Sequence, residues 1–187
     1  RITVDGDDIY CQPGVLLSTI LKACIRNSLK GLEFLSGIPG TAGGAAISNA
    51  GLKEEWLSDR ILRVDVFSLS DIEEKALTRE EIHFDYRKSG LEGYFITGIL
   101  LHLNKGKQED IKGVIATYMK KRIETQPLNY PSAGSVFKNP AGLFAGNLIE
   151  RCGLKGYSIG DACISEKHAN FIINKGKATS EEIYKLI

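Results

Sequence analysis

Several polar segments of the chain combine residue types that can bind an anion or move a proton. The segment IPGTAGGAA places Gly40, Gly43 and Gly44 where bare backbone N–H groups can surround a phosphate. It matches neither GxGxxG nor a P-loop pattern, so the sequence favours neither a Rossmann fold nor a P-loop nucleotidase. A glycine cluster of this kind can equally form a tight structural turn, and the residues alone leave both interpretations open.

A second polar segment, residues 129–142, carries Ser132, Ser135, Lys138 and Asn139. One cation, one amide and a small hydroxyl on the same loop suit a phosphorylated or polyoxygenated ligand, although a solvated loop with Asx and Ser turns uses the same residues. Ser135 lacks a GxSxG context and obvious His and Asp partners, which argues against a hydrolase nucleophile. Its hydroxyl could still deliver a proton, because that role depends on placement more than on an activating triad.

Two further segments supply cations. In FDYRKSG, Arg87 follows Tyr86 in a polar loop between expected strands. It could form a surface ion pair, or it could stabilise negative charge that develops on a carboxylate or an enolate. In SEKHAN, Ser165, Lys167 and His168 precede an apolar strand, an arrangement that is also common in solvated turns. Each segment by itself identifies no activity.

The overall composition limits the classes of function. The chain has 187 residues, of which 43% are hydrophobic and 25% are charged, as in a soluble globular protein. Lys and Arg total 24 against 23 Asp and Glu, and the net charge of +1 gives no strongly basic surface for nucleic acid. No apolar run approaches the ~20 residues of a membrane-spanning helix, and the first residues lack the layout of a signal peptide. We therefore expect a cytoplasmic protein that binds neither nucleic acid nor membranes.

Cysteine and histidine spacing gives no sign of a metal site. Neither residue type forms CxxC, HExxH or another paired-ligand spacing. The residues concerned are Cys11, Cys24, Cys152 and Cys163, and His83, His102 and His168. We expect buried thiols and no protein-bound metal.

The elements that position these segments form a first α+β unit. After a hairpin-like opening, the apolar face of a helix is expected to contain Leu16, Leu17, Ile20, Leu21, Cys24 and Ser28, with Gly31 ending it. Residues 60–69 alternate as a half-buried strand with Leu62, Val64 and Val66 on one face. The segment DIEEKALT predicts a second strand, and the apolar residues 94–103 predict an interior one. A polar turn then marks a boundary between residues 1–106 and 107–187.

A second unit follows the turn. It starts with a helix that has a basic end at residues 120–122, and continues with a short helix around Leu148 and a strand at 169–174. The closing helix has a capping box formed by Thr179 and Glu182. Because the chain opens without methionine and closes after barely two turns of helix, we expect it to be the middle of a longer polypeptide.

The chain resembles the UDP-N-acetylenolpyruvoylglucosamine reductases, the flavoenzymes of peptidoglycan precursor synthesis. The resemblance extends from about Leu35 to Leu186 and rests on four motifs in order: SGIPGTAGGAAISNAG, FDYRKSG, QPLNYPSAGSVFKNP and LIERCGLKGYSIGDACISEKHANFIIN. It implies an α+β FAD-binding domain of the vanillyl-alcohol oxidase type in residues 1–106, of which only the second part is present. A smaller α+β substrate-binding domain would follow in residues 107–187. In the family, NADPH reduces the flavin, which passes hydride to the enolpyruvyl double bond of the UDP-sugar to give UDP-N-acetylmuramate.

The same resemblance implies roles for individual residues. Arg87 corresponds to the residue that stabilises the carboxylate or enolate, and Ser135 to the proton donor that quenches the enol intermediate. The expected flavin contacts are Ile38, Pro39, Gly40, Thr41, Gly43, Gly44 and Ala45. The candidates for holding the UDP diphosphate are Asn139, Lys138, Arg122 and Gln126, with Lys167 and His168 opposite. We expect a monomer that binds FAD, uses NADPH and takes a UDP-sugar as its small-molecule substrate.

The chain also departs from the family's pattern. A GGGSN-like flavin loop and a catalytic glutamate are absent, and we expect them upstream and downstream in the full polypeptide. NAGLKEEW at 49–56 replaces the expected NAGAYG. The short interval between Arg87 and Ser135 indicates the shorter type of enzyme, without the tyrosine-bearing insertion. Two alternatives are a nucleotide-sugar-binding fragment without catalysis, and another oxidase of the same FAD superfamily, against which GSVFKNP argues.

Overall fold

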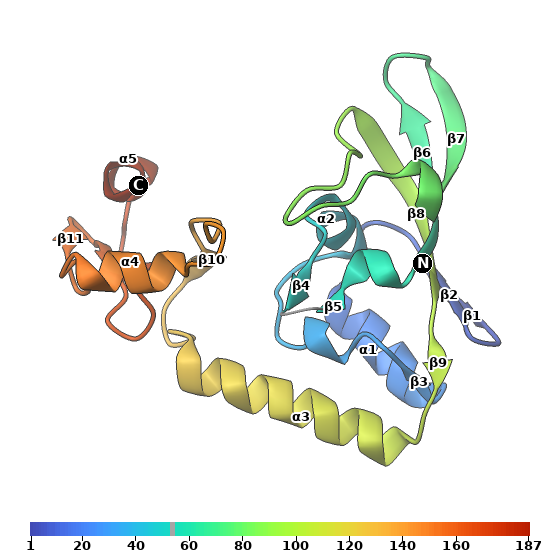
Figure 1. Ribbon diagram of the computed structural model, residues 1–187, viewed down its shortest axis with the longest axis horizontal. Coiled ribbons are helices and arrows are strands. Elements are labelled where there is room, and N and C mark those ends of the chain that lie inside the picture. The colour runs from blue at the N-terminus through green and yellow to red at the C-terminus, as the bar shows by residue number, and fades with distance from the viewer. Residues whose placement is uncertain (53–54) are drawn as a thin grey trace. The chain divides into compact units, whose positions relative to one another are not determined.

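The computed structural model describes residues 1–52 and 55–187, which form two compact α+β units (Figure 1). The first unit comprises Arg1–Met119 and the second Lys120–Ile187. This division falls within helix α3 (Gln108–Thr125), whereas the sequence analysis places a boundary at the turn before that helix. The assignment of the two units to flavin and substrate binding stays a prediction.

A five-stranded antiparallel sheet organises the first unit. The strands, in their order across the sheet, are β1 (Ile2–Asp5), β2 (Asp8–Cys11), β8 (Tyr94–His102), β6 (Ile61–Ser68) and β7 (Glu73–Thr78). The predicted opening hairpin and the three predicted strands are therefore confirmed. Because β8 lies between β2 and β6, the start of the chain pairs with a strand about ninety residues later, which no local pattern could predict.

Strand β6 does not alternate strictly between its two faces. Its register with β8 shifts between Ile61 and Arg63, and Leu62 is 43% exposed while Val64 and Val66 are fully buried. The prediction that Leu62 shares a face with these two valines is wrong, because a bulge changes which side chains point to the core.

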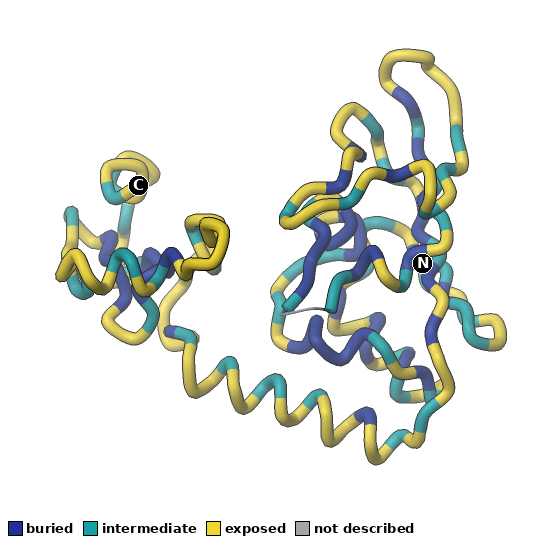
Figure 2. The backbone as a smooth tube through the Cα atoms, in the orientation of Figure 1, coloured by how far each residue is buried: buried dark blue, intermediate teal, exposed yellow. Residues whose placement is uncertain are grey.

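Helix α1 (Leu17–Arg26) covers the core of the first unit. It buries Leu17, Ile20, Leu21 and Cys24, as the pattern predicts. Two residues that the sequence analysis puts on this face lie outside the helix: Leu16 precedes it and is 54% exposed, and Ser28 follows it with a φ of 56°. Figure 2 marks the buried residues of this unit in dark blue along the backbone tube.

Short elements connect the sheet to the rest of the first unit. They are β3 (Leu29–Lys30), which pairs with β9 (Asn104–Lys105), the hairpin of β4 (Gly51–Leu52) and β5 (Glu55–Trp56), helix α2 (Ala42–Ile47), and the 3-10 turns η1 (Glu33–Leu35), η2 (Leu57–Asp59) and η3 (Arg79–Glu81). The β4–β5 pair lies against Arg87, and α2 lies within the glycine segment.

The second unit has its own antiparallel sheet of four short strands. The strands, in spatial order, are β10 (Ser132–Ser135), β13 (Phe171–Asn174), β12 (Ala162–Ile164) and β11 (Ser158–Ile159). Helices α4 (Ala145–Arg151) and α5 (Ser180–Leu186) complete the unit. The predicted capping box is confirmed, since Thr179 Oγ1 accepts from the Glu182 N–H and the Glu182 carboxylate accepts from the Thr179 N–H.

Three of the four cysteines are buried, as expected. Cys152 is exposed, because it caps the C-terminal end of α4. Burial raises the pKa of Cys11 to about 11 and that of Cys24 to about 12, so both thiols are neutral at pH 7. Within residues 1–52 and 55–187, no group of three or more His, Cys, Asp or Glu side chains could hold a metal ion. No helix in the same part of the chain is long and apolar enough to cross a membrane.

Candidate functional site

The glycine segment forms the turn into α2 and packs against the start of α1. The Ala42 N–H donates to the Val15 carbonyl at 2.8 Å, and the Gly43 N–H donates to the Pro13 carbonyl at 2.9 Å. A Cβ atom on Gly43 would lie 2.7 Å from the Pro13 Cβ, so only glycine permits this approach. The Gly44 N–H donates to Thr41 Oγ1, the N-cap of α2. The N–H groups of Gly43 and Gly44 are thus engaged within the chain.

An apolar hollow of about 490 Å³ lies beside the start of this segment. It is lined by Leu16, Ser18, Leu21, Leu35, Gly37, Ile38, Pro39 and Gly40. Ile38, Pro39 and Gly40 are among the expected flavin contacts, and they are at least partly accessible, as are Thr41 and Gly44. Gly43 and Ala45 are buried. The accessible part of the predicted flavin loop is therefore its first half together with Gly44.

Arg87 lies in a tight turn in the first unit. Asp85 and Lys88 exchange two backbone hydrogen bonds of 3.0 and 3.1 Å, and the Asp85 carboxylate accepts from the Tyr86 N–H at 2.6 Å. Arg87 itself adopts a φ of 55°, in the left-handed region that non-glycine residues rarely occupy. Such strain is common at functional sites, where the surrounding structure holds the residue in place.

Asn49 ties this turn to the neighbouring segments. Its side chain is 4% exposed. Its Nδ2 donates to the Asp85 carbonyl at 3.2 Å, and its Oδ1 accepts from the Ser58 N–H at 3.2 Å. One buried amide therefore fixes both the Arg87 turn and η2, a role that the sequence analysis did not assign.

The Arg87 guanidinium is held by backbone carbonyls and aromatic rings. Nη1 donates to the Asn49 carbonyl at 3.2 Å and Nη2 donates to the Gly51 carbonyl at 2.9 Å. The guanidinium carbon lies 5.6 Å from the centre of the Trp56 ring and 5.5 Å from that of Tyr86. These contacts fix the position of the guanidinium, and its role in stabilising a carboxylate or an enolate stays a prediction. Two residues of the segment NAGLKEEW, Lys53 and Glu54, lie outside the described residues.

Ser135 ends strand β10 of the second unit, where it pairs with Phe171 and is exposed. The strand is fixed by Asn170, whose side chain is 4% exposed. Asn170 Nδ2 donates to the Phe137 carbonyl at 2.8 Å and its Oδ1 accepts from the Phe137 N–H at 2.9 Å. The backbone carbonyl of Asn170 accepts from the Val136 N–H. The sequence analysis missed Asn170, although a polar residue directly before an apolar strand was a usable signal.

Removing this amide should loosen the chain around Ser135. We expect Asn170→Ala to destabilise the second unit by about 1–3 kcal/mol, because it leaves the N–H and C=O of Phe137 without protein partners. Faster hydrogen exchange at the amides of β10 and β13 would measure the effect. Asn147→Ala is the matched control, since Asn147 is exposed on α4. Equal exchange rates in the two variants would contradict the prediction.

Asn139 and Lys138 follow Ser135 on the same loop. Asn139 Oδ1 accepts from the Ala145 N–H at 3.0 Å, which ties the loop to the start of α4. Both side chains are exposed. They remain candidates for substrate contact, and neither lines the pocket described next.

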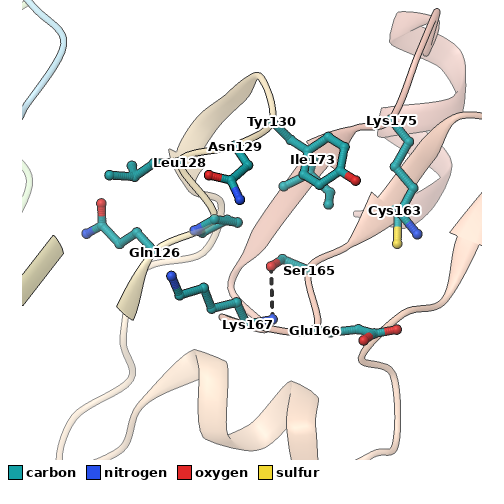
Figure 3. Close-up of a pocket in the computed structure, with 11 residues that line it drawn as sticks. Gln126, Leu128, Asn129, Tyr130, Cys163, Ser165, Glu166, Lys167, Ile173 and Lys175 are labelled. Carbon is teal, nitrogen blue, oxygen red and sulfur yellow. Dashed lines mark hydrogen bonds between the residues drawn. The ribbon is translucent and has the colours of Figure 1, made fainter. Parts of the chain in front are cut away.

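A pocket of about 290 Å³ opens in the second unit (Figure 3). Its lining consists of Gln126, Pro127, Leu128, Asn129, Tyr130, Cys163, Ser165, Glu166, Lys167, Ile173 and Lys175. Of the predicted diphosphate ligands, it brings Gln126 and Lys167 together, while Arg122 and His168 lie outside its lining. Ser165 Oγ accepts from the N–H groups of Lys167 and His168, at 3.1 and 3.3 Å, and so shapes this turn.

The charge state of these candidates follows from their burial. Burial lowers the pKa of His168 below its usual value, so the imidazole is neutral at pH 7 and its Nδ1 accepts from the Asn170 N–H at 3.3 Å. Burial also lowers the pKa of Arg122, which nevertheless stays protonated because arginine starts so high. The Cys163 thiol raises the pKa of Lys175. Lys167, Lys175 and Arg122 can therefore attract a diphosphate by charge, whereas His168 can contribute only a hydrogen bond.

Comparison with known proteins agrees with an α+β fold. The model for the C-terminal domain of UDP-N-acetylenolpyruvoylglucosamine reductases matches residues 126–187. The chain is 42% identical to the reductase of that name from Clostridium perfringens strain SM101 and 44% identical to that from Clostridium tetani, over 100% of this chain. The solved structure of the reductase (MurB) from Thermus caldophilus superposes with a TM-score of 0.89 at 39% identity, covering 98% of this chain and 68% of that one.

These likenesses place the fold among the α+β proteins of the MurB type. The chain belongs to the UDP-N-acetylenolpyruvoylglucosamine reductase family. It spans 61–62% of the length of the two curated clostridial relatives.

Proposed function

We propose that this chain is part of an enzyme that reduces the enolpyruvyl double bond of UDP-N-acetylglucosamine enolpyruvate to give UDP-N-acetylmuramate. The bound cofactor is FAD and the reductant is NADPH. The observation that carries the proposal is the match, at 39% identity and a TM-score of 0.89, to a reductase named for this substrate. The positioned guanidinium of Arg87 supports it from within the chain.

The hollow beside Ile38, Pro39 and Gly40 fits part of a flavin. Its lining is mainly apolar, and a Cβ atom on Gly40 would meet only Leu17 Cδ1, at 3.9 Å. A planar aromatic group can therefore approach bare backbone at this point. When bound, the flavin supplies the hydride that it has received from NADPH.

Arg87 and Ser135 have complementary tasks in this proposal. Hydride addition to the CH2 carbon of the enolpyruvyl group builds up negative charge on the carbon bonded to the carboxylate, and the fixed guanidinium of Arg87 stabilises the resulting enolate. The Ser135 hydroxyl then gives its proton to the carbon bonded to the carboxylate, and the serine regains a proton from solvent. Asn170 keeps the segment after Ser135 in place by its two hydrogen bonds to Phe137.

The pocket of the second unit would hold the UDP diphosphate. Lys167 Nζ donates to the Ile123 carbonyl at 2.5 Å, which orients the ammonium group at the edge of the pocket. Gln126 adds an amide donor, and Lys175 adds a second cation. Charged hydrogen bonds of this kind are stronger than neutral ones.

Lys167→Ala should weaken binding of UDP about tenfold, because one charge-assisted hydrogen bond to a phosphate is lost. Titration calorimetry with UDP at fixed salt concentration measures this. Lys121→Ala makes the same change of charge at an exposed position on α3 and serves as the control. An equal loss in both variants would indicate only a general effect of charge.

The visible absorption spectrum of the full-length protein tests the proposed function. We expect bound flavin that bleaches with NADPH and recovers under anaerobic conditions only when the enolpyruvyl UDP-sugar is added. A colourless protein that cannot be reconstituted with FAD would instead support the nucleotide-sugar-binding alternative. Flavin that is reduced by an alcohol and reoxidised by molecular oxygen would instead support another oxidase of the superfamily.

A further inference from the structure

The indole ring of Trp56 packs against the guanidinium of Arg87. Trp56 lies in the segment where the chain departs from the family's NAGAYG pattern. We propose that Trp56 is a positioning residue, which fixes the orientation of the Arg87 guanidinium toward the substrate. The inference rests on the proposed function, because it is there that Arg87 acquires its role.

Trp56 packs directly on the residue that accepts a hydrogen bond from Arg87. Gly51 and Trp56 face each other across the β4–β5 hairpin. A Cβ atom on Gly51 would lie 2.3 Å from Trp56 Cε3, so the indole ring occupies the space of the missing side chain. The Gly51 carbonyl accepts from Arg87 Nη2 at 2.9 Å. The ring therefore contacts both the guanidinium and the backbone that holds it.

The same ring attracts the cation electrostatically. The Arg87 guanidinium carbon lies 5.6 Å from the centre of the indole ring, within the range of a cation–π interaction. Tyr86 makes a similar contact at 5.5 Å, and the two rings meet edge to face with their centres 5.8 Å apart. Two aromatic rings that contact each other as well as the guanidinium restrict its movement more than carbonyl hydrogen bonds alone.

The hairpin that carries Trp56 is anchored on both sides. The Trp56 N–H donates to the Asp59 carboxylate at 3.1 Å, and the Leu57 N–H donates to the Ala50 carbonyl at 2.8 Å. On the adjacent residue, the Glu55 carboxylate accepts from the Tyr118 hydroxyl of α3 at 2.5 Å. The ring of Trp56 is therefore a fixed surface against which the Arg87 guanidinium packs.

The test compares Trp56→Leu and Trp56→Phe in the full-length protein loaded with FAD. We expect Trp56→Leu to lower kcat for sugar reduction about tenfold, because the cation–π contact is lost, with a smaller effect on KM. Flavin reduction by NADPH should be unchanged, and Trp56→Phe, which keeps an aromatic ring, should lower kcat only about two- to threefold. Phe95→Leu makes a similar change from an aromatic residue to leucine at an exposed position on β8, and it should behave like the wild type.

The proposal is overturned if Trp56→Leu leaves kcat unchanged, or if it slows flavin reduction as much as sugar reduction. Should Trp56→Leu fail to fold, Trp56→Phe decides alone: a drop in kcat of about two- to threefold with normal flavin reduction supports the proposal, and no change refutes it. If the wild-type protein shows no sugar-dependent reoxidation of flavin, the proposed function itself is wrong. The contact is then judged from the Nε–H NMR signal of Arg87, which must move in Trp56→Phe if the ring lies against it.

Discussion

Sugar reduction should fall by about 100-fold or more when Ser135 is replaced by alanine, while flavin reduction by NADPH stays intact. The two half-reactions separate because hydride transfer to the flavin needs no proton from Ser135, whereas completing the product does. Ser135 is exposed at the end of β10, so the loss of its hydroxyl leaves no buried polar group without a partner. Anaerobic stopped-flow absorbance at the flavin band follows both steps on the same sample.

Ser132→Ala provides the matched control for this measurement. Ser132 begins the same strand, is also exposed, and pairs with Ile173. It should leave both half-reactions unchanged. A Ser135→Ala variant that loses both half-reactions equally would show that this residue supports folding or flavin binding instead of proton delivery.

The sequence predicts the elements of this fold better than their partners. Apolar alternation located β6, and the capping box located α5. Each of these signals is made by residues that lie within a few positions of one another in the sequence. The pairing of β2 with β8 joins segments far apart in the chain, and the bulge that exposes Leu62 depends on that pairing. Local periodicity contains no information on either feature.

In the candidate functional site, too, local features were predictable from the sequence and their contact partners were not. The glycine cluster correctly indicated close backbone approach, but the neighbour at Gly43 is Pro13 of the same chain. Asn49 and Asn170 hydrogen-bond to backbone groups of distant segments, at Asp85 and Phe137 respectively. Residue type and spacing can mark such an asparagine, but they do not reveal which distant backbone group it contacts. The roles of Arg87 and Ser135 are predictions from the resemblance.

Arg87→Lys should lower kcat for sugar reduction by about 100- to 1,000-fold, the usual effect of losing a donor that stabilises developing negative charge. Lysine keeps the charge, but it cannot reproduce a planar guanidinium that donates to the carbonyls of Asn49 and Gly51 at once. The backbone strain at φ 55° is the same for both residues, but a carbonyl left without its donor should lower stability by about 1–3 kcal/mol. Steady-state kinetics with the enolpyruvyl UDP-sugar, together with thermal unfolding, separates the two effects.

Arg63→Lys is the control for this change, since Arg63 lies on β6 and pairs with the Asp65 carboxylate in its own strand. It should keep the wild-type kcat. If Arg87→Lys also kept the wild-type kcat, a positive charge alone would be sufficient to stabilise the enolate. The fixed geometry around Arg87 would then not contribute to catalysis. If Arg87→Lys lowered kcat and slowed flavin reduction to the same degree, Arg87 would instead belong to the flavin site. A selective loss of sugar reduction would show that the guanidinium stabilises the enolate. The strained turn, the two carbonyls that accept from Arg87 and the two aromatic rings beside it would then serve to hold the guanidinium in place for that step.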